Sequence, residues 1–461
     1  MQTNNAKALS NNALQWLRSI LTERLGIDLE LKHFTINEHR AFSRLTVPGQ
    51  PNEIRIISNN EIFEQPSNDI PCAYWNPASA GLTGVLAQPL PAPGLKDSEP
   101  ILIESSPNKI EIYYDLLGLI YWQLTRLEEI NVAPKGSHNR YSCNQSHAYR
   151  HGYLSRPIVD EWIDILRQLI ERMWPQLSIK TPFFQLSPSH DVDFPSCYGF
   201  CSKKAMIRRA LSRLVNERDY LSLAQAIQVR TNNSQAQLSS MDPFNTFNWI
   251  MSTSERNGLV SAFYFMAGRT NLLMDGDYEL DHPAILNLLQ AIHSRGHEIG
   301  LHPSYETYLD AHAIEAEARR LIGVCNSIGI QQEHWGGRMH YLRWQQPTTL
   351  LGWNAAGLRY DGTLGYAEQP GFRCGTCHEY PAFDPVSDKQ LELRLRPLIV
   401  MDQTIISDQY LGLGLGEAAR EKILYYKNIC RAVGGIFSLL WHNSQLASAP
   451  AKRLYIECIQ G

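Results

Sequence analysis

The segment Phe-Phe-Gln-Leu-Ser-Pro-Ser-His-Asp-Val-Asp, residues 183–193, ends a predicted strand in two carboxylates. Side chains two residues apart lie on the same face of a strand, so Asp191 and Asp193 are expected to point together. Polar groups also stand where other predicted strands end, in Gly-His-Glu-Ile-Gly-Leu-His (296–302), Arg-Met-His (338–340), Tyr-Asp-Gly-Thr (360–363) and Leu-Trp-His-Asn (440–443). Carboxylate oxygens and imidazole nitrogens bind divalent metals that activate water. The chain is therefore predicted to be a metal-dependent hydrolase.

From residue 183 onward, apolar strand candidates alternate with amphipathic helix candidates. The predicted strands are Phe183–Leu186 running into Asp193, Ser261–Ala267, His297–Leu301, His334–Met339, Leu358–Tyr360, Leu391–Val400 and Gly435–Trp441. The predicted helices are Pro283–Ser294, Ala311–Ser327, Gln346–Ala356 and Gly416–Ala432. This alternation is typical of an α/β fold with a mainly parallel sheet or barrel, whose active site lies at the carboxyl ends of the strands.

The length of 461 residues predicts two domains. A proline-containing stretch around Trp174–Pro188 is the candidate boundary. We expect an N-terminal α/β domain over residues 1–182, with helices at Leu116–Ile130 and Val159–Trp174, and a second domain over residues 183–461.

Composition and charge exclude several classes of protein. The chain is 44% apolar and 19% charged, with a formal net charge of −4, which is globular and gives no overall attraction to nucleic acid. It contains no run long enough to span a membrane, and the N-terminus lacks the pattern of a secretory signal, so a cytoplasmic location is expected. Nine scattered cysteines fit reduced thiols, including the Cys374–Cys377 pair.

A basic insertion interrupts the second domain at residues 196–256. The segment 203–218 carries Lys203, Lys204, Arg208, Arg209, Arg213 and Arg218 at spacings that fit one helix. Such a helix could meet a phosphate, an anionic glycan or a membrane surface, giving a peripheral contact. A solvated basic face is the competing explanation.

The motifs of the second domain, in their order and spacing, resemble those of the polysaccharide deacetylase family, carbohydrate esterase family four. Ser-His-Asp-Val-Asp (189–193) resembles its first motif and Gly-His-Glu-Ile-Gly-Leu-His (296–302) its metal-binding segment. Arg338 and the Leu440–His442 segment resemble its arginine motif and its closing motif. The resemblance implies a distorted (β/α)7 barrel that removes acetyl groups from N-acetylated sugars with a divalent metal, usually Zn²⁺.

Two departures from the family pattern affect the metal site. Val192 separates aspartates that the family has side by side, so the resemblance implies Asp191 as the base and Asp193 as a metal ligand beside His302. The position of the second-motif histidine holds Glu306 instead. The third ligand is then either Glu306 or His340, and we favour His340, because relatives with Arg-x-His-Tyr-Leu-Arg (338–343) go with the shortened motif.

Further roles follow for the remaining polar residues. His442 could protonate a leaving amine, since its ordinary pKa is close to neutral pH. Arg338 stays charged at ordinary pH and would orient Asp191 or a substrate oxygen. Substrate contacts are expected from three residues in the neighbouring loops and strand end, namely Asp361, Arg373 and Trp441. For each of these residues, a structural ion pair, loop bond or packing role is the alternative.

Three functions remain open at this point. The first is N-deacetylation of an acetylated sugar in surface polysaccharide or lipid-linked glycan assembly. The second is hydrolysis of a cyclic amide or ureide, which the same fold can host. The third is a catalytically degenerate barrel that binds glycan, which the replacement of the second-motif histidine would explain. The sequence identifies neither the sugar nor the oligomeric state.

Overall fold

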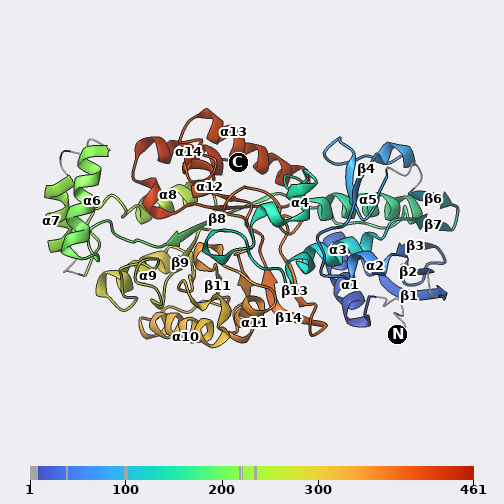
Figure 1. Ribbon diagram of the computed structural model, residues 1–461, viewed down its shortest axis with the longest axis horizontal. Helices are drawn as coiled ribbons and strands as arrows, with labels where there is room; N and C mark the ends of the chain where they lie inside the picture. Colours follow the sequence, from blue (N-terminus) through green and yellow to red (C-terminus); the bar gives the residue numbers. More distant parts are fainter. Residues whose placement is uncertain (1–8, 38–39, 98–101, 217–219, 221, 233–235) are drawn as a thin grey trace.

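A nine-stranded sheet organises the C-terminal part of the chain (Figure 1). The computed structural model describes residues 9–461, apart from 38–39, 98–101, 217–219, 221 and 233–235. The strand order is β13-β14-β12-β11-β10-β9-β8-β16-β15, and all neighbours are parallel except β13 and β14. The strands are β8 (Gln185–Val192), β9 (Ala262–Phe265), β10 (Glu298–Leu301), β11 (Gly336–Gly337), β12 (Tyr360–Asp361), β13 (Tyr380–Asp384), β14 (Lys389–Leu395), β15 (Val400–Met401) and β16 (Ile436–Leu440).

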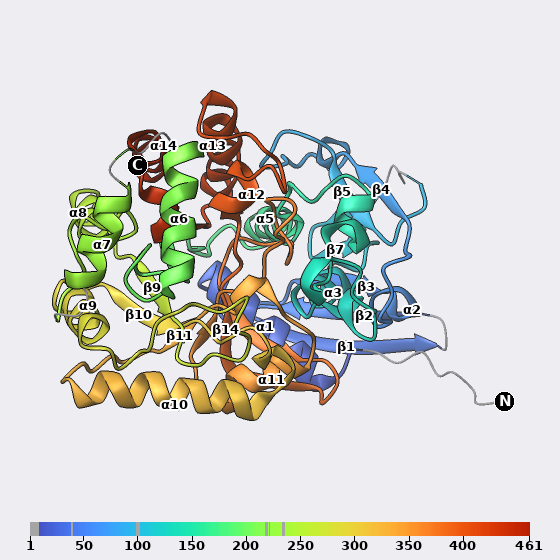
Figure 2. The same ribbon diagram turned by 60° about the vertical axis from the view of Figure 1, so that its left-hand side comes forward.

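Helices follow the strands as the alternating pattern predicts. They are α8 (Phe247–Arg256), α9 (Pro283–Ser294), α10 (Ala311–Ser327), α11 (Thr348–Ala355), α12 (Asp402–Ile406), α13 (Glu417–Ala432) and α14 (Ala449–Ile459). Helices α9, α10 and α11 lie along one side of the molecule and α13 and α14 along the opposite side (Figures 1 and 2). The predicted bounds of α9 and α10 are confirmed. Capping side chains fix their starts, since Asp310 accepts hydrogen bonds from the backbone N–H groups of His312 and Ala313.

Two details of the sheet differ from expectation. The predicted strand Leu391–Val400 is two strands, β14 and β15, because Pro397 between them has no N–H to donate to a neighbour. Strand β13 was not predicted. It is buried along its whole length and pairs antiparallel with β14. The sheet ends at β13 and β15, which do not pair with each other among the described residues, so the structure shows a mainly parallel α/β sheet, and the (β/α)7 barrel stays a prediction.

The residues before β8 form a smaller α/β assembly. Its five-stranded sheet has the order β1-β2-β3-β7-β6, and β4 pairs with β5 separately. The strands are β1 (Glu30–Asn37), β2 (Arg40–Thr46), β3 (Glu53–Ser58), β4 (Cys72–Trp75), β5 (Leu90–Pro93), β6 (Ile103–Ser106) and β7 (Lys109–Ile112). The helices are α1 (Asn11–Leu25), α2 (Asn60–Phe63), α3 (Leu116–Leu124), α4 (His147–Arg150) and α5 (Ile158–Met173). The predicted helix at Val159–Trp174 is thus confirmed as α5, whereas the one at Leu116–Ile130 ends early, at Leu124.

Among the described residues, no helix is both long and apolar enough to cross a bilayer.

The N-terminal assembly packs directly on β13. Trp16 of α1 donates from Nε1 to the carbonyl oxygen of Pro381 at 2.9 Å, and its ring lies 5.1 Å from that of Phe383. Tyr380 donates from its hydroxyl to the carbonyl oxygen of Leu124 at the end of α3, also at 2.9 Å. These contacts are buried, so the two parts of the chain share a core.

A buried ion network reinforces this interface. Arg373, which follows β12 in the chain, donates two hydrogen bonds to Glu129, at 3.0 and 2.5 Å. Arg126 donates to the same carboxylate at 2.8 Å. Burial alone would lower the pKa of Arg373 and raise that of Glu129, but the opposite charges reverse both shifts. Each charge therefore depends on its partners.

We predict that Arg373→Ala destabilises the protein by about 3–5 kcal/mol, because it leaves Glu129 buried with only one strong partner. The free energy of unfolding from urea titration measures the effect. Arg359→Ala is the matched control, since Arg359 forms an exposed pair with Glu392 and should change stability by less than about 1 kcal/mol. Equal losses in the two variants would contradict a special role for the buried network.

Candidate metal and catalytic site

Five polar residues stand just beyond the carboxyl ends of parallel strands. Asp193 follows β8, His302 follows β10, Arg338 follows β11, Asp402 follows β15 and His442 lies two residues beyond β16. Because parallel strands all end at the same edge of the sheet, these residues meet there. The β10–β11 contact is close: a Cβ at Gly337 would lie 1.8 Å from the carbonyl oxygen of Leu301. Glycine at this position lets the segment from Arg338 to His340 approach His302.

Asp193 lies at the centre of this group. Its Oδ1 is 3.2 Å from Nε2 of His302 and 3.6 Å from Nε2 of His340, and its Oδ2 is 3.7 Å from Nε2 of His442. Potential ligand atoms of Asp193, His302 and His340 all lie within 4.8 Å of one another. These three side chains could hold a divalent metal, and the structure brings them together as the sequence predicts.

A second bond orients each of these imidazoles. His302 donates from Nδ1 to the carbonyl oxygen of Arg338 at 2.6 Å, and His340 donates from Nδ1 to Asp275 at 3.1 Å. With Nδ1 donating these bonds, Nε2 of each ring is directed toward Asp193 and offers a lone pair to a metal when the ring is neutral. This is how metal-binding histidines are usually oriented in proteins.

The surroundings of Asp193 favour its ionised form. Its Oδ1 is buried and, within the described part of the chain, accepts no hydrogen bond of good geometry. Burial alone would raise the pKa of Asp193, but the imidazoles of His340, His442 and His302 lower it below the usual range. Burial would likewise lower the pKa of His302, and the carboxylates of Asp191 and Asp193 raise it. An ionised, buried oxygen without a donor fits a bound cation.

Asp191 and Arg338 form a buried pair beside this cluster. Arg338 donates to Oδ1 of Asp191 at 2.7 Å, to the hydroxyl of Ser189 at 3.0 Å and to the carbonyl oxygen of Gly362 at 2.9 Å. The other carboxylate oxygen of Asp191 lies 3.9 Å from Nε2 of His302. Arg338 thus fixes one oxygen of Asp191 and leaves the other facing the cluster.

His442 and Asp402 form a second oriented pair. The carboxylate of Asp402 accepts from Nδ1 and from the backbone N–H of His442, both at 2.8 Å. Burial would lower the pKa of His442, but Asp402 and then Asp193 and Asp191 raise it to about 10. A histidine held as the imidazolium, with Nε2 toward the cluster, is suited to donate a proton.

A cavity of about 710 Å³ contains this site. Asp191, Asp193, His302, His340 and His442 lie in its wall. Two other parts of the chain also line it, the N-terminal assembly through Arg140 and the basic insertion through Arg209, Ser212 and Arg213. Arg140 donates to the carbonyl oxygen of Tyr341 at 2.8 Å. The cavity is therefore built from three separate regions of the sequence.

The structure corrects the expected substrate contacts. Asp361 and Trp441 are fully buried and Arg373 nearly so, and none of them lines the cavity. Burial raises the pKa of Asp361 to about 6. Asp361 accepts hydrogen bonds from Thr363 and Trp344 and not from Arg338. Arg373 bonds to Glu129, and Trp441 packs on Tyr455. Asp361 therefore has a loop hydrogen-bonding role, Arg373 an ion-pairing role and Trp441 a packing role.

Glu306 lies apart from the metal cluster. Its side chain is 51% exposed and pairs with Arg343 at 3.2 Å. Of the two candidates for a third ligand, His340 has the position beside Asp193.

Sequence reasoning missed Asp275, Asp402 and Arg140. Asp402 did carry a signal, because it directly follows the apolar run Leu-Ile-Val-Met (398–401), as the other site residues follow theirs. Asp275 lies in a loop where backbone N–H groups of Thr270, Asn271 and Tyr305 bond to its carboxylate. Nothing in the local sequence distinguishes such a residue from an ordinary loop aspartate.

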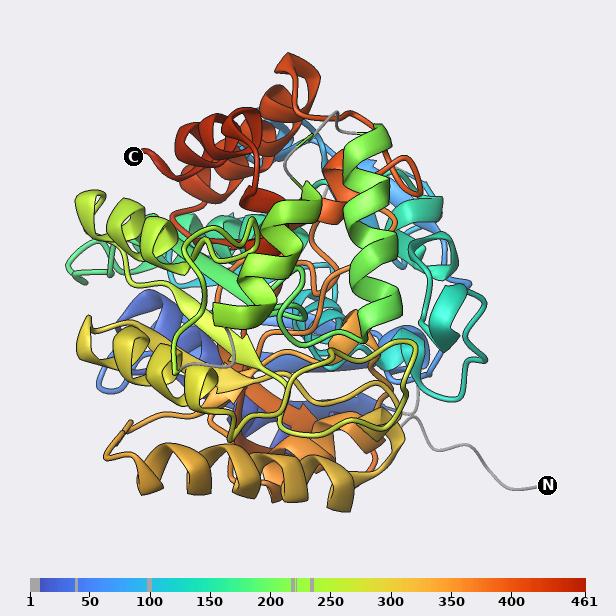
Figure 3. The same ribbon diagram turned by 90° about the vertical axis from the view of Figure 1, so that its left-hand side faces the viewer.

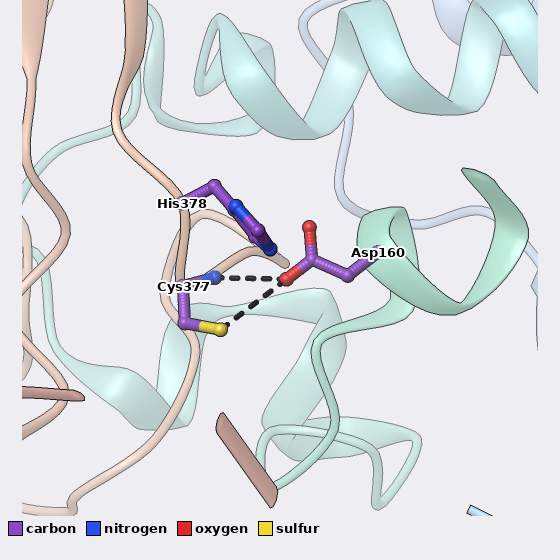
Figure 4. A group of neighbouring side chains, drawn as sticks. All are labelled: Asp160, Cys377 and His378. Atoms are coloured by element: carbon purple, nitrogen blue, oxygen red, sulfur yellow. Dashed lines mark hydrogen bonds between the residues drawn. The ribbon is translucent and has the colours of Figure 1, made fainter. Parts of the chain in front are cut away.

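A second group of potential ligands is structural. Asp160 of α5 lies beside Cys377 and His378, as Figure 4 shows. Its oxygens already accept from Arg24 at 2.8 Å, from the hydroxyl of Thr376 at 2.6 Å and from the backbone N–H of Cys377 at 3.0 Å. A carboxylate so fully bonded ties α5 to the segment before β13 and has no need of a cation.

Comparison with known proteins gives limited similarity. Residues 5–175 match a family of unknown function (DUF7033). No curated protein matches the chain significantly. A solved structure described as a "putative polysaccharide deacetylase from Mycobacterium smegmatis" is similar with a TM-score of 0.39 and 16% sequence identity, covering 61% of this chain and 84% of that one. The superposition is weak, so the proposal below rests on the side chains of the site.

We predict that His340→Ala abolishes the retention of a divalent metal, because it removes one of the three side chains that could hold the ion. Glu306→Ala should leave the metal content nearly unchanged. Elemental analysis of the purified variants measures this, with circular dichroism to check that each is folded. Loss of metal in Glu306→Ala with retention in His340→Ala would show that Glu306, and not His340, is the third ligand.

Proposed function

We propose that the chain is a metal-dependent hydrolase that removes the N-acetyl group from an acetamido sugar. The observation that carries the proposal is the buried Asp193 carboxylate facing three imidazole nitrogens, with Asp191 and His442 beside it. The donor set of one carboxylate and two imidazoles suits Zn²⁺. The motif order that resembles polysaccharide deacetylases supports an acetylated sugar as the substrate.

Asp193, His302 and His340 would hold the metal. When bound, a divalent metal polarises the amide carbonyl and makes an attacking water more acidic. The second oxygen of Asp191 would accept the proton of that water, a role supported by the bond from Arg338 that holds the carboxylate. His442 donates the proton that the departing amine needs, and Asp402 holds the ring in orientation. Each proton thus has a defined group that takes or gives it.

The activity is tested by acetate release from a panel of acetamido glycans. Asp191→Asn and His442→Ala should each lower kcat by about 10²–10⁴-fold, because each removes one proton-transfer group, and both should keep the metal. If the metal-loaded protein releases no acetate but opens a cyclic amide, its activity is hydrolysis of a cyclic amide or ureide and not deacetylation. Metal-free protein whose glycan affinity is unchanged in Asp193→Ala and His302→Ala would instead indicate a binding module.

We predict a smaller effect for Asp402→Asn, a loss of about 10–100-fold in kcat with metal content unchanged, because the residue positions His442 without reaching the substrate. The alkaline limb of the kcat pH profile should move to lower pH, because Asp402 raises the pKa of His442 and its charge is lost in the variant. Asp384→Asn is the matched control, since Asp384 is equally buried but caps the turn after β13. If both variants shift kcat and its pH profile equally, Asp402 has no specific role.

A further inference from the structure

The basic insertion forms a helical hairpin at one end of the molecule. Helix α6 (Lys203–Asn216) and helix α7 (Ser222–Asn232) pack side by side and stand away from the nine-stranded sheet (Figures 1 and 3). Their facing sides enclose a small core made of Cys197, Tyr198, Cys201, Met206, Ala210, Ala226 and Val229. Arg218, which was expected in the basic helix, lies outside the described residues.

The exposed surface of this hairpin includes large aliphatic side chains. Ile207, Leu211 and Val215, spaced four residues apart on α6, are 47%, 45% and 73% exposed. Leu223 and Ile227 of α7 are 41% and 64% exposed. Residues at this spacing form one stripe along a helix, and the inner core is already filled by other side chains. Several large aliphatic side chains close together on a surface mark an interaction site.

The two helices of this hairpin are strongly basic, although the segment between them contains Glu217 and Asp219. Neither helix contains an aspartate or a glutamate, and together they carry Lys203, Lys204, Arg208, Arg209, Arg213 and Arg230. This concentration contrasts with the net charge of −4 for the whole chain. Lys203, Lys204 and Arg208 are exposed, and within the described part of the chain they form no ion pair with an acidic side chain. The hairpin therefore attracts an anionic surface.

We propose that the hairpin α6–α7 docks on the surface of a bilayer that contains anionic phospholipid. Exposed aliphatic side chains flanked by lysine and arginine suit the interface between headgroups and acyl chains. A second copy of this hairpin would bring like charges together, which disfavours self-association through this face. A nucleic acid would use the charges but gain nothing from the aliphatic stripe.

Docking would place the cavity at the membrane. Arg209, Ser212 and Arg213 of α6 line the cavity that contains Asp193, so the helix that carries the proposed docking face also forms part of the cavity wall. Resting on the proposed function, this arrangement makes a membrane-attached acetamido glycan the substrate class. A soluble sugar would need no such element beside the site.

Vesicle flotation of the full-length protein tests the docking. Binding is expected to vesicles of phosphatidylcholine mixed equally with phosphatidylglycerol, and not to pure phosphatidylcholine, with a steep decrease as salt is added. The triple variant Lys203→Gln, Lys204→Gln and Arg208→Gln should weaken partitioning on the order of 100-fold. Ile207→Ser with Leu211→Ser should weaken it on the order of 10-fold.

The matched control for the aliphatic variant is Leu272→Ser with Leu273→Ser, in an exposed loop at 74% and 91% exposure, which should bind as the unchanged protein does. Equal binding to both vesicle types, or equal losses in the control, would overturn the proposal. So would light scattering that shows a hairpin-dependent dimer without lipid.

Acetate release from a water-soluble substrate should be unchanged in the hairpin variants. Vesicle binding without any acetate release would therefore overturn only the deacetylase activity, and acetate release without vesicle binding only the docking.

Discussion

The arrangement around Asp193 depends on one electrostatic constraint, a buried carboxylate oxygen that no hydrogen-bond donor among the described residues satisfies. An ionised carboxylate removed from water must be balanced by nearby positive charge. In this structure the balance can come from protons on His302 and His442, whose pKa values the surrounding carboxylates raise. A divalent cation would supply the same charge and release protons from the imidazoles, so cation binding and proton release are coupled.

This constraint explains why the polar residues around the cluster are themselves so well fixed. His302 is bonded to a backbone carbonyl, His340 to Asp275 and His442 to Asp402, so that each ring directs Nε2 inward. The rigid sheet edge determines where each segment starts, and these outer bonds determine the direction of each ring. The N-terminal assembly also contributes to the site, because Arg140 lines the cavity and bonds to Tyr341. Glu129 of the same assembly accepts a hydrogen bond from the buried Arg373.

The sequence predicted those features that depend on local pattern. Strands ending in Asp191, His302 and Arg338 and the bounds of α9 and α10 follow from apolar periodicity and capping residues. Burial was harder to predict, because Asp361, Arg373 and Trp441 look like surface contacts until distant segments cover them. Glu129 and Arg373 are 244 residues apart in the chain, and no local signal joins them. Asp275 was missed for the same reason, since its role exists only once His340 lies beside it.

Helix α6 contributes to both the cavity and the outer surface, because one face lines the cavity and another face is exposed. Arg209 on the inner face bonds to the carbonyl oxygen of Cys197 and pairs with Asp277, and its guanidinium lies 5.0 Å from the ring of Phe194, directly after Asp193. Ile207 and Leu211 face outward only two residues away on either side. A shift of the helix on docking would therefore be transmitted to the cavity wall through Arg209 and Phe194. The hairpin has a small core of its own, which joins its two helices so that they would move together.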